Sequence, residues 1–255
     1  MKVTKVLFAI ALVCLLSVMT VDTVSIAESA DDIDAQALIR KVETQYQGET
    51  SYAIMHMRIV TDAWSRELTM ESWSEGRDKF LARILTPKKE QGTTSLKIED
   101  DMWNYLPKID RVIKIPSSLM GDSWMGSHLT NDDLVKENKI DELYTFEIEK
   151  VENSVATVIC TPKPDAAIVW GKVIYRVDLD RTIPVDVAYY DEDGELVRTM
   201  TFDKVENISG RWVPLRMIVK PVDKPDEMTE LTYENIKFDI KLENDLFSLR
   251  SLRRR

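Results

Sequence analysis

The sequence predicts a mainly β protein with a few helices, in which neighbouring strands run antiparallel. From residue 51 onward, apolar and polar residues alternate with a period of two, most clearly over residues 172–180, and this period is typical of strands with one buried face. Turn signals such as Asp193-Gly194 and Ser209-Gly210 separate the runs. Strands joined by such tight turns form an antiparallel meander, because parallel strands need long crossover connections.

The predicted strands fall into two groups, one on each side of residues 116–143. No internal repeat and no low-complexity linker divides the chain, so residues 28–255 are predicted to form one domain. The first group of strands is expected at 51–61, 66–75, 78–86, 94–100, 102–106 and 110–115. The second group is expected at 144–151, 155–161, 169–179, 184–190, 195–206, 211–220 and 228–240.

A helix is predicted before the first strand, over residues 31–47. Ile33, Leu38 and Val42 recur there at helical spacing. Acidic residues at the start and Gly48 just past the end are typical signals of the two helix termini.

Residues 116–143 interrupt the strand pattern with a long segment that carries a helix start at 130–133. A long insertion in a compact β domain is commonly a functional loop. Its apolar side chains, such as Leu119 and Trp124, need a place to be buried. The insertion is therefore expected either to plug the core or to form a lid over a ligand cavity, and one segment can do both.

The N-terminus has the layout of a secretory signal. Two lysines precede an apolar run over residues 6–19, and Ala27 supplies a small residue at the cleavage position. The run is shorter than the roughly 20 residues that a membrane-spanning helix needs. Residues 1–27 are therefore predicted to be a signal peptide cleaved near Ala27, with an uncleaved membrane anchor as the alternative.

The two cysteines predict no disulfide. Cys14 lies inside the apolar run and follows Val13, where a lipid-attachment motif needs a small residue, so a lipidated mature form is not expected. Cys160 is then alone, in an apolar run without a charged neighbour that would lower its pKa. It is expected to be buried and inert.

The charge of the chain argues against nucleic acid as a partner. The net charge is −10, whereas a nucleic-acid surface needs clustered positive charge. The exception is the C-terminal end, where Arg250 is followed by arginines at 253–255. A solvated terminus explains these arginines, and attraction to an anionic membrane or an acidic partner is the alternative.

No catalytic or metal-binding pattern stands out. His56 has no metal-binding residue at ligand spacing, and the acidic run 191–195 fits a hairpin turn better than a calcium loop. The nucleophile-elbow, phosphate-loop and zinc-protease motifs are absent. The protein is therefore predicted not to be an enzyme and to need no cofactor or metal.

The apolar residues are unusual in kind. The chain has 11 methionines and 6 tryptophans, and methionine adapts to ligands of varied shape. In the strand at 51–61, Ile54 and Val60 share one face while Met55 and Met57 share the other. A sheet that is apolar on both faces must be covered on both, either by helices or by a bound acyl chain.

Residues 102–134 carry a resemblance to a known family. The run MWNYLPKIDRVIKIPSSLMGDSWMGSHLTNDDL combines an aromatic strand ending in Leu-Pro, a basic strand and a Met-Gly-Ser segment before an Asp-rich helix start. Together with residues 244–252, this run resembles the outer-membrane lipoprotein-sorting proteins, relatives of the periplasmic lipoprotein carrier LolA. The likeness spans nearly the whole chain after the signal.

The resemblance implies an antiparallel, unclosed half β-barrel covered by helices, as in LolA and LolB, with an apolar cavity for acyl chains. It implies a periplasmic carrier, without cofactor or catalytic residues, that moves lipid or lipoprotein acyl chains towards the outer membrane. An inner-membrane transporter and an outer-membrane acceptor are candidate partners. In that family an arginine on an early strand holds the lid shut, and Arg66 is the counterpart by position.

The carrier hypothesis assigns roles to apolar residues of the strands and the insertion. The lid is expected to consist of Leu119, Met120, Trp124 and Met125. The residues expected to line or border the cavity are Met55, Met57, Met70, Trp73, Trp103, Met200 and Met217.

Two other functions stay open on the sequence. One is a non-enzymatic periplasmic adaptor that works with a membrane transporter through an edge strand or the arginine-rich end. The other is an esterase-like hydrolase, which would require Ser123 or Ser127 to pair with His128.

Overall fold

The computed structural model describes residues 33–254 except 46, 47, 137, 138 and 167. The predicted signal peptide and its cleavage site lie outside the described residues. Among the residues that the structure describes, no helix is long and apolar enough to cross a lipid bilayer.

The described strands form one antiparallel sheet of 13 strands in the order β6-β5-β4-β3-β2-β1-β13-β12-β11-β10-β9-β8-β7. The fold class is therefore confirmed as a mainly β, unclosed antiparallel arch. The first six strands are β1 Thr50–Val60, β2 Ser65–Glu75, β3 Lys79–Thr86, β4 Thr94–Ile98, β5 Asp101–Leu106 and β6 Arg111–Lys114. The others are β7 Tyr144–Glu152, β8 Val155–Pro162, β9 Lys172–Asp178, β10 Ile183–Tyr190, β11 Leu196–Ile208, β12 Arg211–Pro221 and β13 Met228–Phe238.

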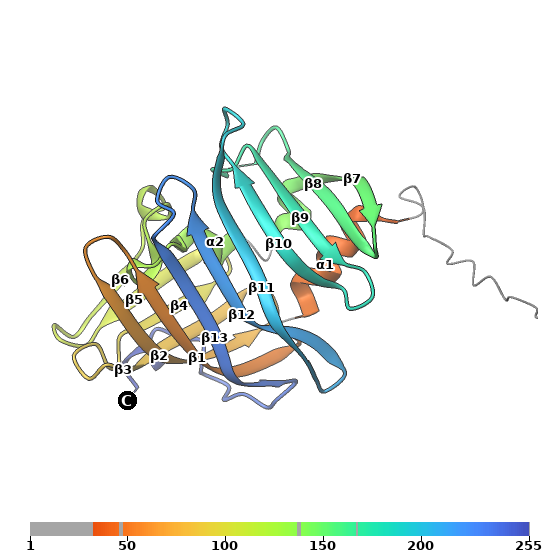
Figure 1. Cartoon of the computed structure of the whole chain (residues 1–255). Helices are drawn as coiled ribbons and strands as arrows, with labels where there is room; N and C mark the ends of the chain where they lie inside the picture. The colour runs from red at the N-terminus through yellow and green to blue at the C-terminus, as the bar shows by residue number, and fades with distance from the viewer. Residues whose placement is uncertain (1–32, 46–47, 137–138, 167, 255) are drawn as a thin grey trace, which may run out of the picture.

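The chain enters this sheet in the middle. From β1 it meanders outward to the edge strand β6, and from the other edge, β7, it meanders back until β13 pairs with β1. The predicted insertion is the connection between the two edges, so it has to pass across the open side of the arch. Figure 1 shows the bent sheet with α1 and α2 on the same side of it.

The helices are few and short. α1 spans Ala35–Gln45, α2 spans Asn131–Lys136 and α3 spans Ile140–Leu143, with short 3-10 turns at Ser117–Leu119, Trp124–Gly126 and Ser251–Arg253. The helix that the sequence predicts at 31–47 corresponds to α1, which buries Ile39 and Val42. Asp34 caps it, because its Oδ1 accepts a hydrogen bond from the Ala37 N–H at 2.9 Å.

The main hydrophobic core lies on the inner face of the arch, between the sheet and these helices. Ile39 and Val42 of α1 pack there with Met57, Met70 and other fully buried side chains of the strands. Cys160 belongs to the same core, and burial raises the pKa of its thiol, which agrees with the inert role expected from sequence.

A second, smaller core lies on the outer face of β3–β5. Leu81 and Leu96 are buried there against Leu246 and Leu252 of the C-terminal segment. The arginine-rich end is also tied down, because Arg253 pairs with Asp110, and Arg254 pairs with Glu243 and Asp245. Its arginines at 253 and 254 therefore do not form the frayed terminus that the sequence favours.

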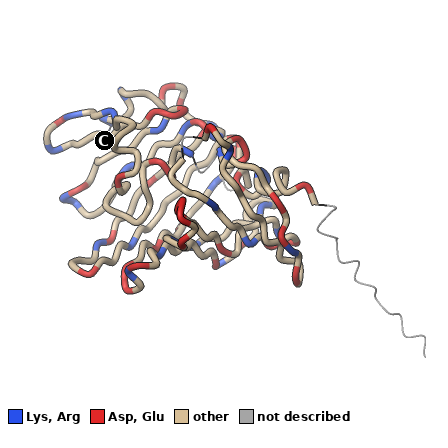
Figure 2. Tube along the Cα trace, turned by 90° about the horizontal axis from the view of Figure 1, so that it is seen from above, with Lys and Arg blue, Asp and Glu red and all other residues tan. Residues whose placement is uncertain are grey.

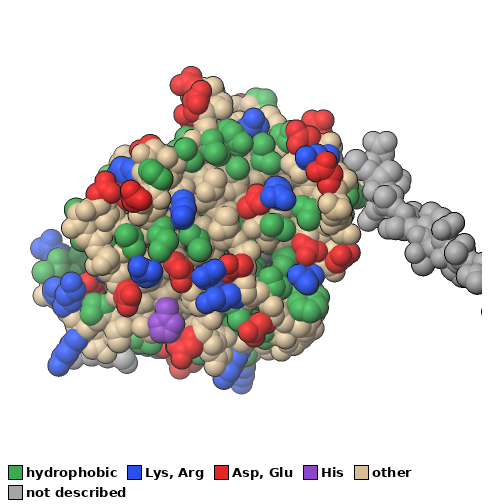
Figure 3. Space-filling view, viewed as in Figure 1, with side chains coloured by type: hydrophobic (Ala, Val, Ile, Leu, Met, Phe, Trp, Pro, Cys, Tyr) green, Lys and Arg blue, Asp and Glu red, His purple; other side chains and the backbone are tan. Residues whose placement is uncertain are grey.

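The charges on the molecule are mixed. Figure 2, which shows the trace from above, has acidic and basic residues interspersed along the strands and turns. Figure 3 shows apolar side chains scattered among charged ones on the face that it presents. On that face, Figure 3 shows no large surface of a single charge sign.

Candidate functional site

A cavity of about 230 Å³ lies under the arch, between the inner face of the sheet and the covering segments. Its wall is mostly apolar. The side of the sheet contributes Met55, Phe202, Met217 and Leu231, among others. The covering side contributes Trp124, Leu129 and Leu134 of the insertion.

The cavity exists because small side chains replace large ones near one end of β1 and β2. Met55 lies opposite Met70, but the next inward-facing pair is Ala53 with Ser72, followed by Ser51 with Ser74. These four small residues line the cavity. Well-packed interiors leave few voids larger than a water molecule, so the cavity left by this row of small residues is unusual.

Trp124 closes much of the cavity from above. Its side chain is 2% exposed, and its ring lies 6.5 Å from that of Phe80 in an edge-on arrangement. The indole N–H donates to Ser95 Oγ at 3.1 Å, and that hydroxyl donates to Asn104 Oδ1 at 2.7 Å. The insertion therefore places a large wedge over the arch and orients it with one hydrogen bond.

Arg66 fastens the tip of the insertion. Its Nη1 donates to the carbonyl oxygen of Met125 at 2.9 Å, and its Nη2 forms an ion pair with Glu90. Arg66, the positional counterpart of the family's lid-closing arginine, therefore contacts the segment that is expected to form the lid.

Arg198 on β11 forms a second fastening that the sequence analysis missed. Its Nη1 and Nη2 meet the two carboxylate oxygens of Asp133 at 2.6 and 2.9 Å, with the side chains only 5% and 7% exposed. The guanidinium also stacks 4.2 Å from the ring centre of Tyr189. In sequence, Asp133 fits a capping box with Thr130, and both reciprocal bonds of that box are present. Because the capping box already explains an acidic residue at this position, the sequence does not indicate the ion pair with Arg198.

His128 forms a third fastening of the insertion. Its ring nitrogens lie 2.9 Å from Thr229 Oγ1 and 3.0 Å from Glu227 Oε2. The hydroxyl of Ser127 donates instead to the carbonyl of Trp124 at 2.8 Å. This geometry lacks the nucleophile–base hydrogen bond that the esterase alternative requires. In the described part of the chain, no group of three His, Cys, Asp or Glu side chains could hold a metal ion.

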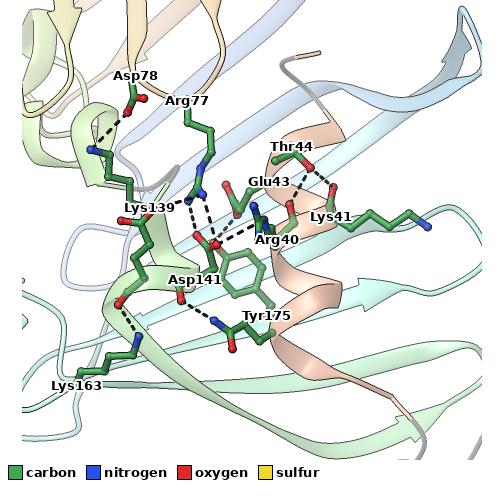
Figure 4. A network of polar contacts seen from close by, with 12 residues as sticks. Arg40, Lys41, Glu43, Thr44, Arg77, Asp78, Lys139, Asp141, Lys163 and Tyr175 are labelled. Atoms are coloured by element: carbon green, nitrogen blue, oxygen red, sulfur yellow. Dashed lines mark hydrogen bonds and ion pairs between the residues drawn. The ribbon is translucent and has the colours of Figure 1, made fainter. Parts of the chain in front are cut away.

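The open end of the cavity is polar. Gly76 in the β2–β3 turn is exposed and lies on the cavity wall, so the cavity opens beside that turn. Glu43 of α1 also lines it and accepts a hydrogen bond of 2.9 Å from the Tyr175 hydroxyl. Figure 4 shows Glu43 and Tyr175 beside an ion pair between Arg77 and Asp141 that ties the turn to α3.

A buried lysine is bonded to the turn at this end of the cavity. Lys97 on β4 is 1% exposed and donates to the carbonyl of Arg77 at 2.8 Å. Burial, assisted by the positive charge of Lys139, lowers the pKa of Lys97 to about 8. The charged form is therefore disfavoured in the folded protein.

This shift predicts a pH dependence of stability. Below pH 8 both the folded and the unfolded chain hold the Lys97 proton, and the folded state bears the full cost of burying the charge. Between pH 8 and about 10.4 only the folded state releases the proton, so stability rises with pH. Urea unfolding measures the free energy of unfolding of the wild type and of a Lys97→Met variant. The wild-type value minus the variant value is expected to rise by roughly 2 kcal/mol from pH 7.5 to 9.5. An unchanged difference would contradict the shift.

The residues selected from sequence fall in four places. Met55, Met217 and Trp124 line the cavity. Met57, Met70 and Met200 are fully buried in the surrounding core, and Met120 and Met125 pack against that core, whereas Leu119 is 44% exposed.

Trp73 and Trp103 differ from the prediction, because they lie on the outer face against the C-terminal segment. Their position follows from strand alternation. Trp73 lies between Ser72 and Ser74, which face the cavity. Residue size directs the prediction to bulky residues, but the small residues beside them form the cavity.

Comparisons with known proteins agree with this fold. A family model with the description "Uncharacterized protein" matches residues 76–254. A search of curated proteins found no match.

Three solved structures have a similar fold. An outer membrane lipoprotein-sorting protein domain from Vibrio parahaemolyticus is 25% identical with a TM-score of 0.76, over 88% of this chain and 100% of that one. A DUF1329 family protein from Desulfovibrio piger is 24% identical with a TM-score of 0.79, over 85% and 97% of the two chains. A LolA superfamily protein from Nitrosomonas europaea is 19% identical with a TM-score of 0.71, over 86% and 99%. The chain therefore belongs to the family whose model matches residues 76–254, and it has the fold of the outer-membrane lipoprotein-sorting proteins and the LolA superfamily.

Proposed function

We propose that this protein is a non-enzymatic periplasmic carrier that binds lipid, or the acyl chains of lipoproteins, and moves them towards the outer membrane. The observation that supports it best is the apolar cavity enclosed between the inner face of the sheet and the insertion. The similarity to a lipoprotein-sorting protein domain points the same way.

The energetics suit reversible binding. Each buried CH₂ group contributes about 0.8 kcal/mol, so an acyl chain of ordinary length binds without any covalent step. Ligand pockets are typically about 300–1,000 Å³, and this cavity is smaller at about 230 Å³. Loading therefore requires the insertion to move aside, which adds the space now filled by Trp124, Leu129 and Leu134.

The fastenings of the insertion are consistent with such movement. Arg66, Arg198 and His128 hold it by hydrogen bonds and ion pairs to the strands. Polar contacts of this kind can be replaced by water when the segment lifts, whereas its apolar side chains in the core, such as Trp124 and Leu129, would have to be covered by the ligand instead. Arg66 and Arg198 are thus proposed to keep the empty carrier closed.

The contacts of the arginine-rich end do not favour an adaptor that works through that end. Arg253 and Arg254, which were to contact a partner, already pair with carboxylates of the same chain. Deleting residues 251–255 would also remove Leu252, which is 0% exposed in the outer core. Loss of a partner after that deletion would therefore report unfolding as readily as a lost contact.

Filling the cavity is expected to abolish ligand uptake. An Ala53→Leu variant places a larger side chain among the small residues of the cavity wall, at a position 2% exposed. Delipidated protein is titrated with a fluorescent fatty-acyl probe, and the variant is expected to lose at least tenfold in affinity while it stays folded by circular dichroism.

The matched control is Ala188→Leu, the same substitution on the outward-facing side of β10. It is expected to bind the probe as the wild type does. Wild-type affinity in Ala53→Leu, or no uptake by the wild type itself, would overturn the carrier proposal.

A further inference from the structure

The cavity wall changes character along the strands. In the middle of the sheet, Met57 pairs with Leu68 and Leu231, and Met55 pairs with Met70. Towards the open end the inward-facing residues become hydroxylic. They are Ser72, Ser51 and Ser74, with the Tyr175 hydroxyl across the cavity.

The three serine hydroxyls are only partly satisfied within the protein. Ser51 Oγ and Ser74 Oγ share one hydrogen bond of 2.6 Å, which leaves each oxygen further bonding capacity. The hydroxyl of Ser72, which is 6% exposed, donates to the sulfur of Met55 at 3.8 Å, and a thioether is a weak acceptor. Hydroxyls directed into a buried space normally have partners, so a polar group of a ligand is the natural occupant of this end.

The charges at the open end disfavour an anion. Glu43 carries a carboxylate on the cavity wall. The nearby guanidiniums of Arg40 and Arg77 are both engaged by Asp141, as Figure 4 shows. Lys79, which also borders the cavity, pairs with Glu75.

The other charges facing this region do not change that balance. Glu142 adds a further carboxylate beside Arg77, and Asp133 is already bound by Arg198. An anionic head would thus meet the Glu43 carboxylate at an opening where Arg40, Arg77 and Lys79 already have carboxylate partners.

We infer that the cavity takes an amphiphile with an uncharged, hydrogen-bonding head, such as a glycerol ester, which contacts Ser51, Ser72 and Ser74. The apolar tail lies towards Trp124 and Leu129, and the head lies at the opening beside α1. This inference rests on the proposed carrier function and specifies the ligand class of the same cavity.

The test compares probes of equal chain length on the delipidated protein by isothermal titration calorimetry. A monoacylglycerol is expected to bind at least tenfold more tightly than the matching fatty-acid anion or lysophosphatidic acid. A Ser51→Ala, Ser74→Ala double variant is expected to lose two- to tenfold in affinity for the monoacylglycerol and little for the fatty acid. Ser65→Ala, at the exposed far end of β2, is the matched control and should change neither.

The charge argument has its own variant. Glu43→Gln keeps an acceptor for the Tyr175 hydroxyl but removes the negative charge. It should therefore reduce the ratio of the monoacylglycerol affinity to the fatty-acid affinity several-fold. Anionic probes that bind as tightly as the monoacylglycerol, or serine variants with unchanged affinity, would overturn the inference. If no probe bound at all, the carrier proposal itself would fail.

A glycerol ester can belong to a free lipid or to the anchor of a lipoprotein. A second titration therefore compares the monoacylglycerol with a synthetic peptide that carries a diacylglyceryl group. Tight binding of either supports the uncharged head, and the tighter of the two identifies the source.

Discussion

An Arg198→Met variant is expected to have a free energy of unfolding about 3–5 kcal/mol lower than the wild type, because it leaves the Asp133 carboxylate buried without its main partner. The two side chains are 5% and 7% exposed and meet through two hydrogen bonds. The pair also connects the insertion to β11, so the loss should appear first at the insertion. Urea unfolding measures the free energy, and the difference in acrylamide quenching between backgrounds with Trp124 and with Trp124→Phe reports whether the insertion has lifted.

The ion pair itself can be separated from general damage to the core. Adding Asp133→Asn to Arg198→Met removes the unpaired charge while Asn keeps the capping role at α2, so the double variant should regain part of the lost stability. Arg198→Lys retains the charge without the two-pronged geometry and should lie between wild type and Arg198→Met. Equal losses in all three variants would mean that packing alone, rather than the buried pair, stabilises this position.

A Trp124→Ala variant is expected to be less stable and yet to bind acyl chains more readily. Removing a buried tryptophan typically costs about 3–5 kcal/mol. Because the indole lies on the cavity wall, its removal enlarges the space open to a ligand. Thermal unfolding measures the loss, and titration with the fluorescent fatty-acyl probe measures the gain, which should exceed threefold.

Trp124→Phe provides the comparison. It keeps most of the ring volume and loses only the hydrogen bond to Ser95, so its affinity should stay near that of the wild type. If Trp124→Ala remained folded but took up less probe, the indole would be a ligand contact rather than the plug described above.

The fold could be predicted from sequence because it depends on local patterns. The period-two alternation located every strand of the sheet to within a few residues, as at 211–220 for β12, Arg211–Pro221. The turn pair at Ser209-Gly210 separates β11 from β12 as expected. Alternation does not reveal that β1 pairs with β13, since that contact joins segments far apart in the chain, and the family resemblance had to supply the arch.

The site could be predicted only in part, because the cavity forms where large side chains are absent. Residue size directed attention to methionine and tryptophan, and Met55, Met217 and Trp124 do line the space. Ala53 and Ser72, which create it, look unremarkable in sequence. Arg198 also lies far from Asp133 along the chain, and no spacing rule connects two such residues before the sheet has formed.

The pairing of β1 with β13 has a consequence for how the protein is made. β1 leaves the ribosome early, but its second neighbour is complete only at Phe238, close to the end of the chain. Contacts between such distant segments form slowly, because a long loop must close first. One wall of the arch therefore waits, with its apolar side uncovered, until the residues up to Phe238 are available. During that interval the exposed apolar surface and the unpaired edge of β1 favour aggregation.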